Sequence, residues 1–344
     1  MQADRTTSRA EQSQERASDM MARVSDRLAP SQASPRLGYY YAALNAIISG
    51  FAIYINSLGV KMFSDAALYT TLKNVVVGIA LLVPTLLLAR QRAELGRLSS
   101  RQWGALVALA VIGGSVPYVL FFRGLQMTTP VTGALLNHTQ FLLVAVLAFF
   151  LLAERAGALV WGALIVLLVA TNLGLNLGAV EFNEGALLIA ISTALFAVGV
   201  VLAKRLLRDL STLTVMSAKM SLGALILVGY VAATGHLGAV SQLSAQQWTF
   251  VLVTGLILLA FTITAFMALR YASATAATAI PAAAPIITTL LVVFAAGQVK
   301  LTPVDGLSLV LMLLAAGTIF VVGARREERE QAAERNRPTE GVAV

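Results

Sequence analysis

Apolar runs dominate the sequence and recur about every 28 residues between two polar ends. Each run holds the roughly 20 residues that a helix needs to cross the hydrocarbon core of a bilayer. Backbone polar groups cannot stay unpaired in lipid, so each run predicts a membrane-spanning helix. The ten predicted spans cover residues 38–60, 67–89, 102–123, 130–152, 157–178, 185–207, 211–234, 246–269, 273–296 and 304–323.

The composition agrees with a protein that lies mostly within a membrane. Of the 344 residues, 58% are hydrophobic and 12% are charged, whereas soluble domains are about half apolar and a quarter charged. These values exclude a soluble enzyme, a disordered protein and a nucleic-acid module with a membrane anchor. The absence of Cys excludes disulfides, thiolate metal sites and a Cys nucleophile, and two His disfavour a His-based metal cluster. We therefore expect no cofactor and no metal.

The net charge of +8 fits either an anionic partner such as nucleic acid or basic loops that face anionic lipid. The placement of Lys and Arg favours the second interpretation. If the N-terminus is cytoplasmic, 20 of the 25 basic residues fall on the cytoplasmic side of the predicted spans. We therefore predict a multi-pass protein of the inner (plasma) membrane with no nucleic-acid partner. Residues 1–37 and 324–344 are expected to be polar cytoplasmic tails, the second of which could prolong the last helix.

The chain resembles itself at an offset near 144 residues. Leu125, Phe150 and Gly162 fall on Leu269, Phe294 and Gly306 at this offset. The hydropathy pattern divides accordingly into two units, residues 38–178 and 179–323. Each unit has five predicted spans, an odd number, so the second unit is expected to be inverted in the membrane. Inverted repeats are typical of alternating-access transporters, whose substrate site lies near the midplane between the repeats.

The order of several short motifs resembles the EamA-type branch of the drug/metabolite transporter superfamily. The first unit ends in Leu152-Ala153-Glu154-Arg155 followed by Trp161-Gly162, and the second carries Leu269 to Ala274 followed by Ala283-Ala284-Pro285. The resemblance covers about residues 38–323. It implies an all-α membrane protein of ten transmembrane helices in two inverted five-helix repeats, with helices 1–4 and 6–9 around the cavity. It also implies export of a small amphipathic metabolite such as an amino acid.

The sequence departs from the family pattern at acidic positions. The usual Glu-Pro pair of helices 4 and 9 is replaced by Gln140-Phe141 and Ala284-Pro285, and the second Gly-Glu turn is Gly297-Gln298. No Asp or Glu lies within a predicted span except Asp305, which stands beside the turn at the start of the last span. A carboxylate relay for protons or an acidic Na⁺ site therefore has no candidate residues in the membrane.

Two lysines lie at nearly the same place in the two units. Lys73 is about 9 Å into span 2 and Lys219 about 12 Å into span 7, at 1.5 Å per residue. A charge at the centre of a span costs at least about 2.5–3.5 kcal/mol. Each lysine either extends its ammonium group to the interface or faces the cavity and attracts an anionic group of the substrate.

Further candidates are polar or helix-breaking residues within spans. Gly113-Gly114 and Pro117 are expected to interrupt span 3, and Pro281 and Pro285 to kink span 9 and free backbone carbonyls. The polar candidates could contact substrate or form hydrogen bonds between helices. They are Asn137, His138 and Gln140 of span 4 and Asn45 and Tyr54 of span 1. Ser49 and Asn56 lie on the same face of span 1 as Asn45.

These observations predict a membrane transporter whose partners are a small-molecule metabolite and the lipid bilayer. A channel-like facilitator or lipid scramblase remains an alternative, because it would use a similar polar pathway. A membrane-embedded enzyme is a weaker alternative, because no reactive constellation is found within the spans. The oligomeric state is left open.

The charge distribution makes the topology testable. Reporter fusions after Arg326 should report the cytoplasm, and fusions within residues 235–244 should report the outside. A periplasmic position for the first fusion would contradict both the orientation and the number of spans.

Overall fold

The computed structural model describes residues 34–60, 62–63, 65–173, 175, 178, 180–296 and 301–335. The expectations for residues 1–33, for Lys61 and Lys300, and for the Gly297-Gln298 turn lie outside these ranges. Within them the chain is helical and has no strand. The helices are α2 (Pro35–Val60), α3 (Ala66–Leu87), α4 (Ala89–Arg97), α5 (Ser100–Gly114), α6 (Val116–Met127), α7 (Pro130–His138), α8 (Gln140–Leu151), α9 (Ala158–Asn172), α10 (Glu184–Asp209), α11 (Thr212–Ala233), η2 (His236–Gln242), α12 (Ala245–Tyr271), α13 (Ala274–Ala279), η3 (Pro281–Ala283), α14 (Pro285–Ala296) and α15 (Pro303–Arg335).

Nine helical segments of the described chain are long and apolar enough to cross a bilayer, some of them built from two consecutive helices. The protein is therefore a multi-pass membrane protein. The fifth predicted span, residues 157–178, corresponds to α9, which has 15 residues and ends at Asn172. The predicted count of ten spans is thus not confirmed. The last helix, α15, continues without a break from residue 303 into the charged segment after Ala324 and ends at Arg335.

Spans 3 and 4 of the first repeat are each divided into two helices. Span 3 breaks at Ser115 between α5 and α6, next to the glycines and the proline that predict the interruption. Span 4 breaks at Thr139, which the sequence pattern did not predict. The hydroxyl and the amide of Thr139 both donate to the carbonyl of Leu136, at 2.6 and 3.1 Å. This local bonding replaces one regular helical bond, as Thr side chains do when they compete with the backbone.

The helices of the two halves correspond in order and spacing. The first repeat is α2 to α9 and the second is α10 to α15. Helices α3 and α11 start 146 residues apart, at residues 66 and 212, and α9 and α15 start 145 apart, at 158 and 303. The fourth span of each repeat is divided, α7 and α8 in the first repeat and α13, η3 and α14 in the second. These spans also correspond, because α7 and α13 start at residues 130 and 274, 144 apart. Both repeats therefore interrupt their fourth span at the same place.

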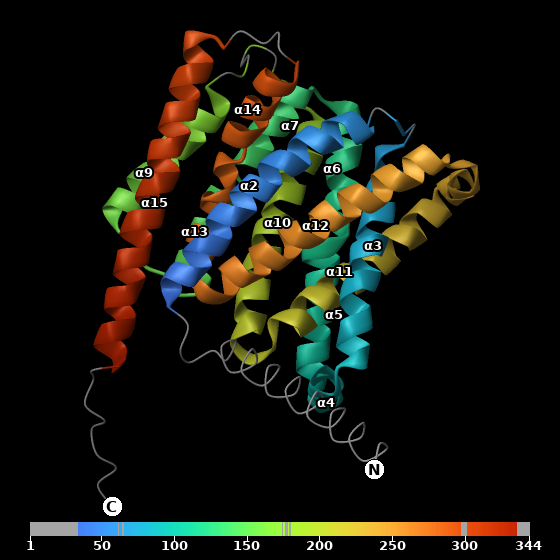
Figure 1. The fold of residues 1–344 in the computed structure, drawn as a ribbon, viewed down its shortest axis with the longest axis horizontal. Helices are drawn as coiled ribbons and strands as arrows, with labels where there is room; N and C mark the ends of the chain where they lie inside the picture. Colours follow the sequence, from blue (N-terminus) through green and yellow to red (C-terminus); the bar gives the residue numbers. More distant parts are fainter. Residues whose placement is uncertain are drawn as a thin grey trace, which may run out of the picture.

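Most of the extensive helix contacts join a helix of one repeat to a helix of the other (Figure 1). Helix α2 packs along α12, and the equivalent α10 packs along α5 and α6. Helices α3 and α11 pack together, as do α9 and α15, which lie at one edge of the molecule in Figure 1. Exchanging the two repeats leaves this pattern unchanged, as expected for two units related by a pseudo-two-fold axis.

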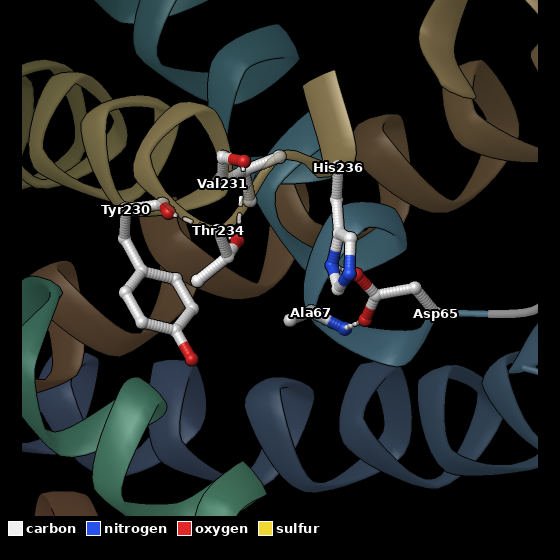
Figure 2. A network of polar contacts seen from close by, with 6 residues as sticks. All are labelled: Asp65, Ala67, Tyr230, Val231, Thr234 and His236. Carbon is white, nitrogen blue, oxygen red and sulfur yellow. Dashed lines mark hydrogen bonds and ion pairs between the residues drawn. The ribbon is translucent and has the colours of Figure 1, made fainter. Parts of the chain in front are cut away.

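Helices α3 and α11 run in opposite directions. At the start of α3, Asp65 caps the helix by accepting from the amide of Ala67 and pairs with His236, just after α11, at 2.7 Å (Figure 2). At the other end, Gln91 accepts a hydrogen bond of 2.9 Å from Ser211, the cap of α11. Since α3 and α11 are equivalent in the two repeats, their opposite directions agree with an inverted second repeat.

Glycines allow the repeats to approach closely. A Cβ built on Gly199 of α10 would lie 2.6 Å from the Cα of Gly113 in α5. A Cβ on Gly185 of α10 would lie 2.7 Å from the carbonyl oxygen of Gly124 in α6. Small residues at such crossings let helix backbones touch, which is how membrane helices gain packing energy without a hydrophobic driving force between them.

A substitution at this crossing should destabilise the protein. Gly199→Ala places a methyl group against the backbone of Gly113, so the helices must separate, and we expect a loss of about 1–3 kcal/mol. Gly162→Ala in α9 is the matched control, because its Cβ would meet nothing within 4 Å. Thermal unfolding of the purified proteins in detergent measures both. Equal melting temperatures for the two variants would contradict the close contact.

Candidate functional site

A cavity of about 490 Å³ lies between the two repeats. Its walls come from α2, α5, α6, α7, α8 and α9 of the first repeat and from α10, α11, α12, α13, η3 and α14 of the second. The predicted wall of helices 1–4 and 6–9 therefore needs two corrections: α3 contributes no lining residue, and α9 contributes Thr171. Seven of the nine predicted site residues line it: Asn45, Asn137, His138, Gln140, Lys219, Pro281 and Pro285.

The break between α7 and α8 supplies the polar side chains of the cavity. Asn137 and His138 end α7, Gln140 starts α8, and all three side chains are half-buried. The Nδ1 atom of His138 lies 3.1 Å from the Oδ1 atom of Asn172 in α9, which fixes the imidazole ring against the neighbouring helix. His138 thus joins two helices of the first repeat as well as lining the cavity.

The divided ninth span forms another part of the cavity wall. Pro281 begins the 3₁₀ turn η3 and Pro285 begins α14, and neither can donate a backbone hydrogen bond. The sequence predicts that the carbonyls of Ala277 and Pro281 lose their partners. For Pro281 this is wrong, because its carbonyl accepts from the amide of Ala284 at 2.9 Å within the 3₁₀ turn. Ala277 lines the cavity, where a freed carbonyl is tolerated.

The two equivalent lysines occupy different surroundings. Lys219 is the eighth residue of α11, lines the cavity and has its Nζ atom 5.5 Å from the ring centre of Phe266. Lys73 is the eighth residue of α3 but is absent from the cavity wall. Its ammonium group donates to Oδ1 of Asn56 at 2.8 Å and lies 4.2 Å from the ring centre of Tyr69. The structure therefore brings only Lys219 to the cavity.

The two candidates of α2 are also separated. Asn45 is buried at the cavity wall, and its amide donates to the carbonyl of Phe261 and the hydroxyl of Thr264 in α12, both at 2.8 Å. This side chain joins the two repeats. Tyr54 is half-buried on the same helix but does not line the cavity.

Several residues of the cavity wall gave no signal in the sequence. Five of them are aromatic, and an aromatic side chain in an apolar span gives the same sequence pattern whether it faces lipid, another helix or a cavity. Tyr118 and Phe196 pack edge to face with ring centres 4.9 Å apart. The lining residues missed include Tyr118, Phe141, Thr171, Phe196, Phe261 and Phe266.

At one end of the bundle, α10 and α12 each cap the C-terminus of the other helix. Lys204 of α10 donates to the carbonyls of Leu269 and Ala272 at the end of α12, both at 2.7 Å. In return, Arg270 of α12 donates to the carbonyls of Leu207 and Leu210 at the end of α10. Cations at helix C-termini interact favourably with the helix dipole. These bonds connect the sixth and eighth spans.

Two carboxylates cap the start of α13 at the same end. Glu154 accepts from the amides of Ala274 and Thr275, at 2.8 and 3.3 Å. Glu327 of α15 accepts from the hydroxyl of Tyr39 at 2.6 Å and the amide of Ser273 at 3.1 Å. Five of the basic residues predicted to share the cytoplasmic side line a cavity of about 550 Å³ here: Arg155, Lys204, Arg208, Arg270 and Arg326.

Comparison with known proteins follows the same division into two repeats. The model of the EamA-like transporter family matches residues 36–174 and 183–321. This match confirms the resemblance that the sequence motifs indicate. A solved structure described only as "Crystal structure of protein" is 20% identical, covers 83% of this chain and 98% of its own, and gives a TM-score of 0.64, so the two share a fold. No curated protein matches the chain.

The divided ninth span should matter more for turnover than for stability. Replacing both Pro281 and Pro285 with Ala restores two amide donors and favours a continuous helix. We expect the double variant to stay folded and to lose most of its turnover in a transport assay. Pro84→Ala, within α3 and away from the cavity, is the control and should keep its turnover. Unchanged turnover in the double variant would assign these prolines to packing.

Proposed function

The chain belongs to the EamA-like transporter family, and on that premise we propose that it exports a small amphipathic metabolite, such as an amino acid, by alternating access. The observation that carries the proposal is the cavity between the repeats, with an interrupted helix from each repeat in its wall. Its volume of about 490 Å³ falls within the range of roughly 300–1,000 Å³ typical of small-molecule sites. Interrupted helices at such a site are a feature of secondary transporters.

The proposed substrate contacts follow from the cavity wall. Asn137, Gln140 and Lys219 line the same cavity with two side-chain amides and an ammonium group, while aromatic rings offer an apolar surface. This combination suits a molecule with one polar end and one apolar end. His138 and Asn45 are proposed to hold the wall, since both bond neighbouring helices. Pro281 and Pro285 are proposed to shape it.

Alternating access is favoured over a channel-like facilitator or a scramblase by the packing of the repeats. Equivalent helices cross in opposite directions, so exchanging the conformations of the two repeats would open the cavity to the other side. A facilitator needs no such exchange. A membrane-embedded enzyme is not favoured, because the described lining residues combine no nucleophile with a general base that a third group orients.

Counterflow in proteoliposomes tests the mechanism. Vesicles that contain the protein are loaded with an unlabelled amphipathic metabolite and given a trace of the same labelled compound outside. Alternating access predicts transient accumulation of label inside, driven by the unlabelled pool. Equilibration without accumulation would support a facilitator, and absence of any flux above protein-free vesicles across a panel of metabolites would contradict transport.

Coupling to protons is expected to be absent. The described lining residues include no carboxylate, and His138, the one imidazole among them, is fixed by Asn172. We therefore expect flux to be indifferent to an imposed pH gradient, and His138→Gln to keep most of its flux, because Gln can also bond Asn172. Flux driven by the gradient in the wild type and lost in His138→Gln would instead assign the proton to His138. A drive that survives the substitution would point to the lysines.

A further inference from the structure

The charge of the central cavity is unbalanced. Among its described lining residues, Lys219 is the one charged side chain, and no Asp, Glu or Arg accompanies it. Its ammonium group has no hydrogen bond or ion pair within the described chain, and its nearest aromatic neighbour is the ring of Phe266. A positive charge in such a place is costly unless something pairs with it. The protein therefore presents one unmatched cation to whatever fills the cavity.

The equivalent lysine shows that this lack of a partner is specific to Lys219. Lys73 is 9% exposed and is bonded to Asn56, whose Oδ1 atom also accepts from the hydroxyl of Tyr69 at 2.9 Å. Asn56 lies on α2, and the helix starts of the two repeats are related by offsets of 144 to 149 residues. The corresponding residues of α10 at those offsets are Val200, Val201, Leu202, Ala203, Lys204 and Arg205. None of these side chains can accept a hydrogen bond.

The tyrosine that contacts Lys73 also has no equivalent beside Lys219. Tyr69 of α3 corresponds to Val215 of α11 at the offset of 146 residues that relates these two helices. Val215 is buried and apolar, so it offers Lys219 neither a hydroxyl nor a ring. The first repeat thus carries hydrogen-bond partners for its lysine, whereas the second repeat offers Lys219 only the ring of Phe266. A bound anion would supply in the second repeat what Asn56 supplies in the first.

The rest of the wall defines the other end of the ligand. Rings of Tyr118, Phe196, Phe261 and Phe266 and the side chain of Phe141 line the cavity. Aromatic and apolar walls favour a hydrophobic body, and one ammonium group neutralises one negative charge. A zwitterion would bring an ammonium group of its own, for which the described wall has no carboxylate.

We propose that the cavity selects an amphipathic organic monocarboxylate without an ammonium group, held by Lys219 at its carboxylate and by the aromatic wall at its apolar body. This proposal deepens the proposed transport function and rests on it for physiological meaning. It narrows the substrate from any small amphipathic metabolite to an anion and replaces the amino acid given above as an example. A free amino acid would leave the cavity with a net positive charge. Lys73 has no direct part in binding and instead fixes α3 to α2.

Four probes with one phenyl body and different charges test the selection. They are 3-phenylpropionate (anion), phenylalanine (zwitterion), 3-phenylpropionamide (neutral) and phenylalanine amide (cation). Binding to the purified full-length protein in detergent is measured by calorimetry and by thermal shift. We expect 3-phenylpropionate to bind about tenfold or more tighter than the other three, since hydrogen bonds to charged groups contribute about 1.5–3 kcal/mol.

Variants of the two lysines identify the residue responsible. Lys219→Met should remove the preference for the anion and lower its affinity about tenfold or more. Lys219→Arg should retain part of the preference for the anion, because the guanidinium group keeps the positive charge in the cavity. Lys73→Met is the matched control. It should lower the melting temperature, since it removes the hydrogen bond to Asn56 and the contact with the Tyr69 ring, and it should keep the order of affinities.

The outcomes separate this inference from the transport function. Equal affinity for phenylalanine and 3-phenylpropionate, or equal loss of anion binding in Lys73→Met and Lys219→Met, would overturn the selection for a monocarboxylate. Transport of phenylalanine with no preference for the anion would overturn the selection while leaving transport intact. Anion binding that depends on Lys219, without flux in proteoliposomes, would support the site and contradict the transport function.

Discussion

The need to satisfy backbone hydrogen bonds inside a membrane governs this structure. A helix may break in lipid only where the freed groups find other partners or face a cavity. The fourth span of the first repeat breaks at Thr139, whose hydroxyl takes up the carbonyl of Leu136. The equivalent span of the second repeat breaks at Pro281 and Pro285, where a 3₁₀ turn takes up one carbonyl. Both breaks meet at the cavity, which is where this constraint allows them.

The cavity has its shape because each repeat packs mainly on the other. Glycine contacts between α5 and α10 bring the backbones together, and Asn45 bonds α12 across the same boundary. At one end, Lys204 and Arg270 cap each other's helices and Glu154 caps α13. These bonds are made between helix ends and join α10, α12 and α13 in addition to the glycine contacts.

Sequence symmetry does not extend to chemical symmetry. Lys73 and Lys219 hold equivalent positions, yet Asn56 and Tyr69 pair with the first and only Phe266 approaches the second. The difference lies in the residues around each lysine. It gives Lys73 a structural contact and Lys219 a place in the cavity wall. This difference is the basis of the anion site proposed at Lys219.

The sequence by itself determined the class of the protein. Runs of apolar residues set the helices, the repeat offset set the two units, and motifs around Glu154 and Trp161 indicated the family that the match to residues 36–174 and 183–321 confirms. Seven of the nine proposed site residues line one cavity, because polar and helix-breaking residues in a membrane gather where lipid is absent. Tertiary structure alone decided the break at Thr139, the aromatic wall and the separate environments of the lysines. The aromatic wall and the lysine environments depend on which helix lies opposite, and hydropathy along one helix carries no record of its neighbour. The break at Thr139 depends on the direction of one hydroxyl, which hydropathy does not record either.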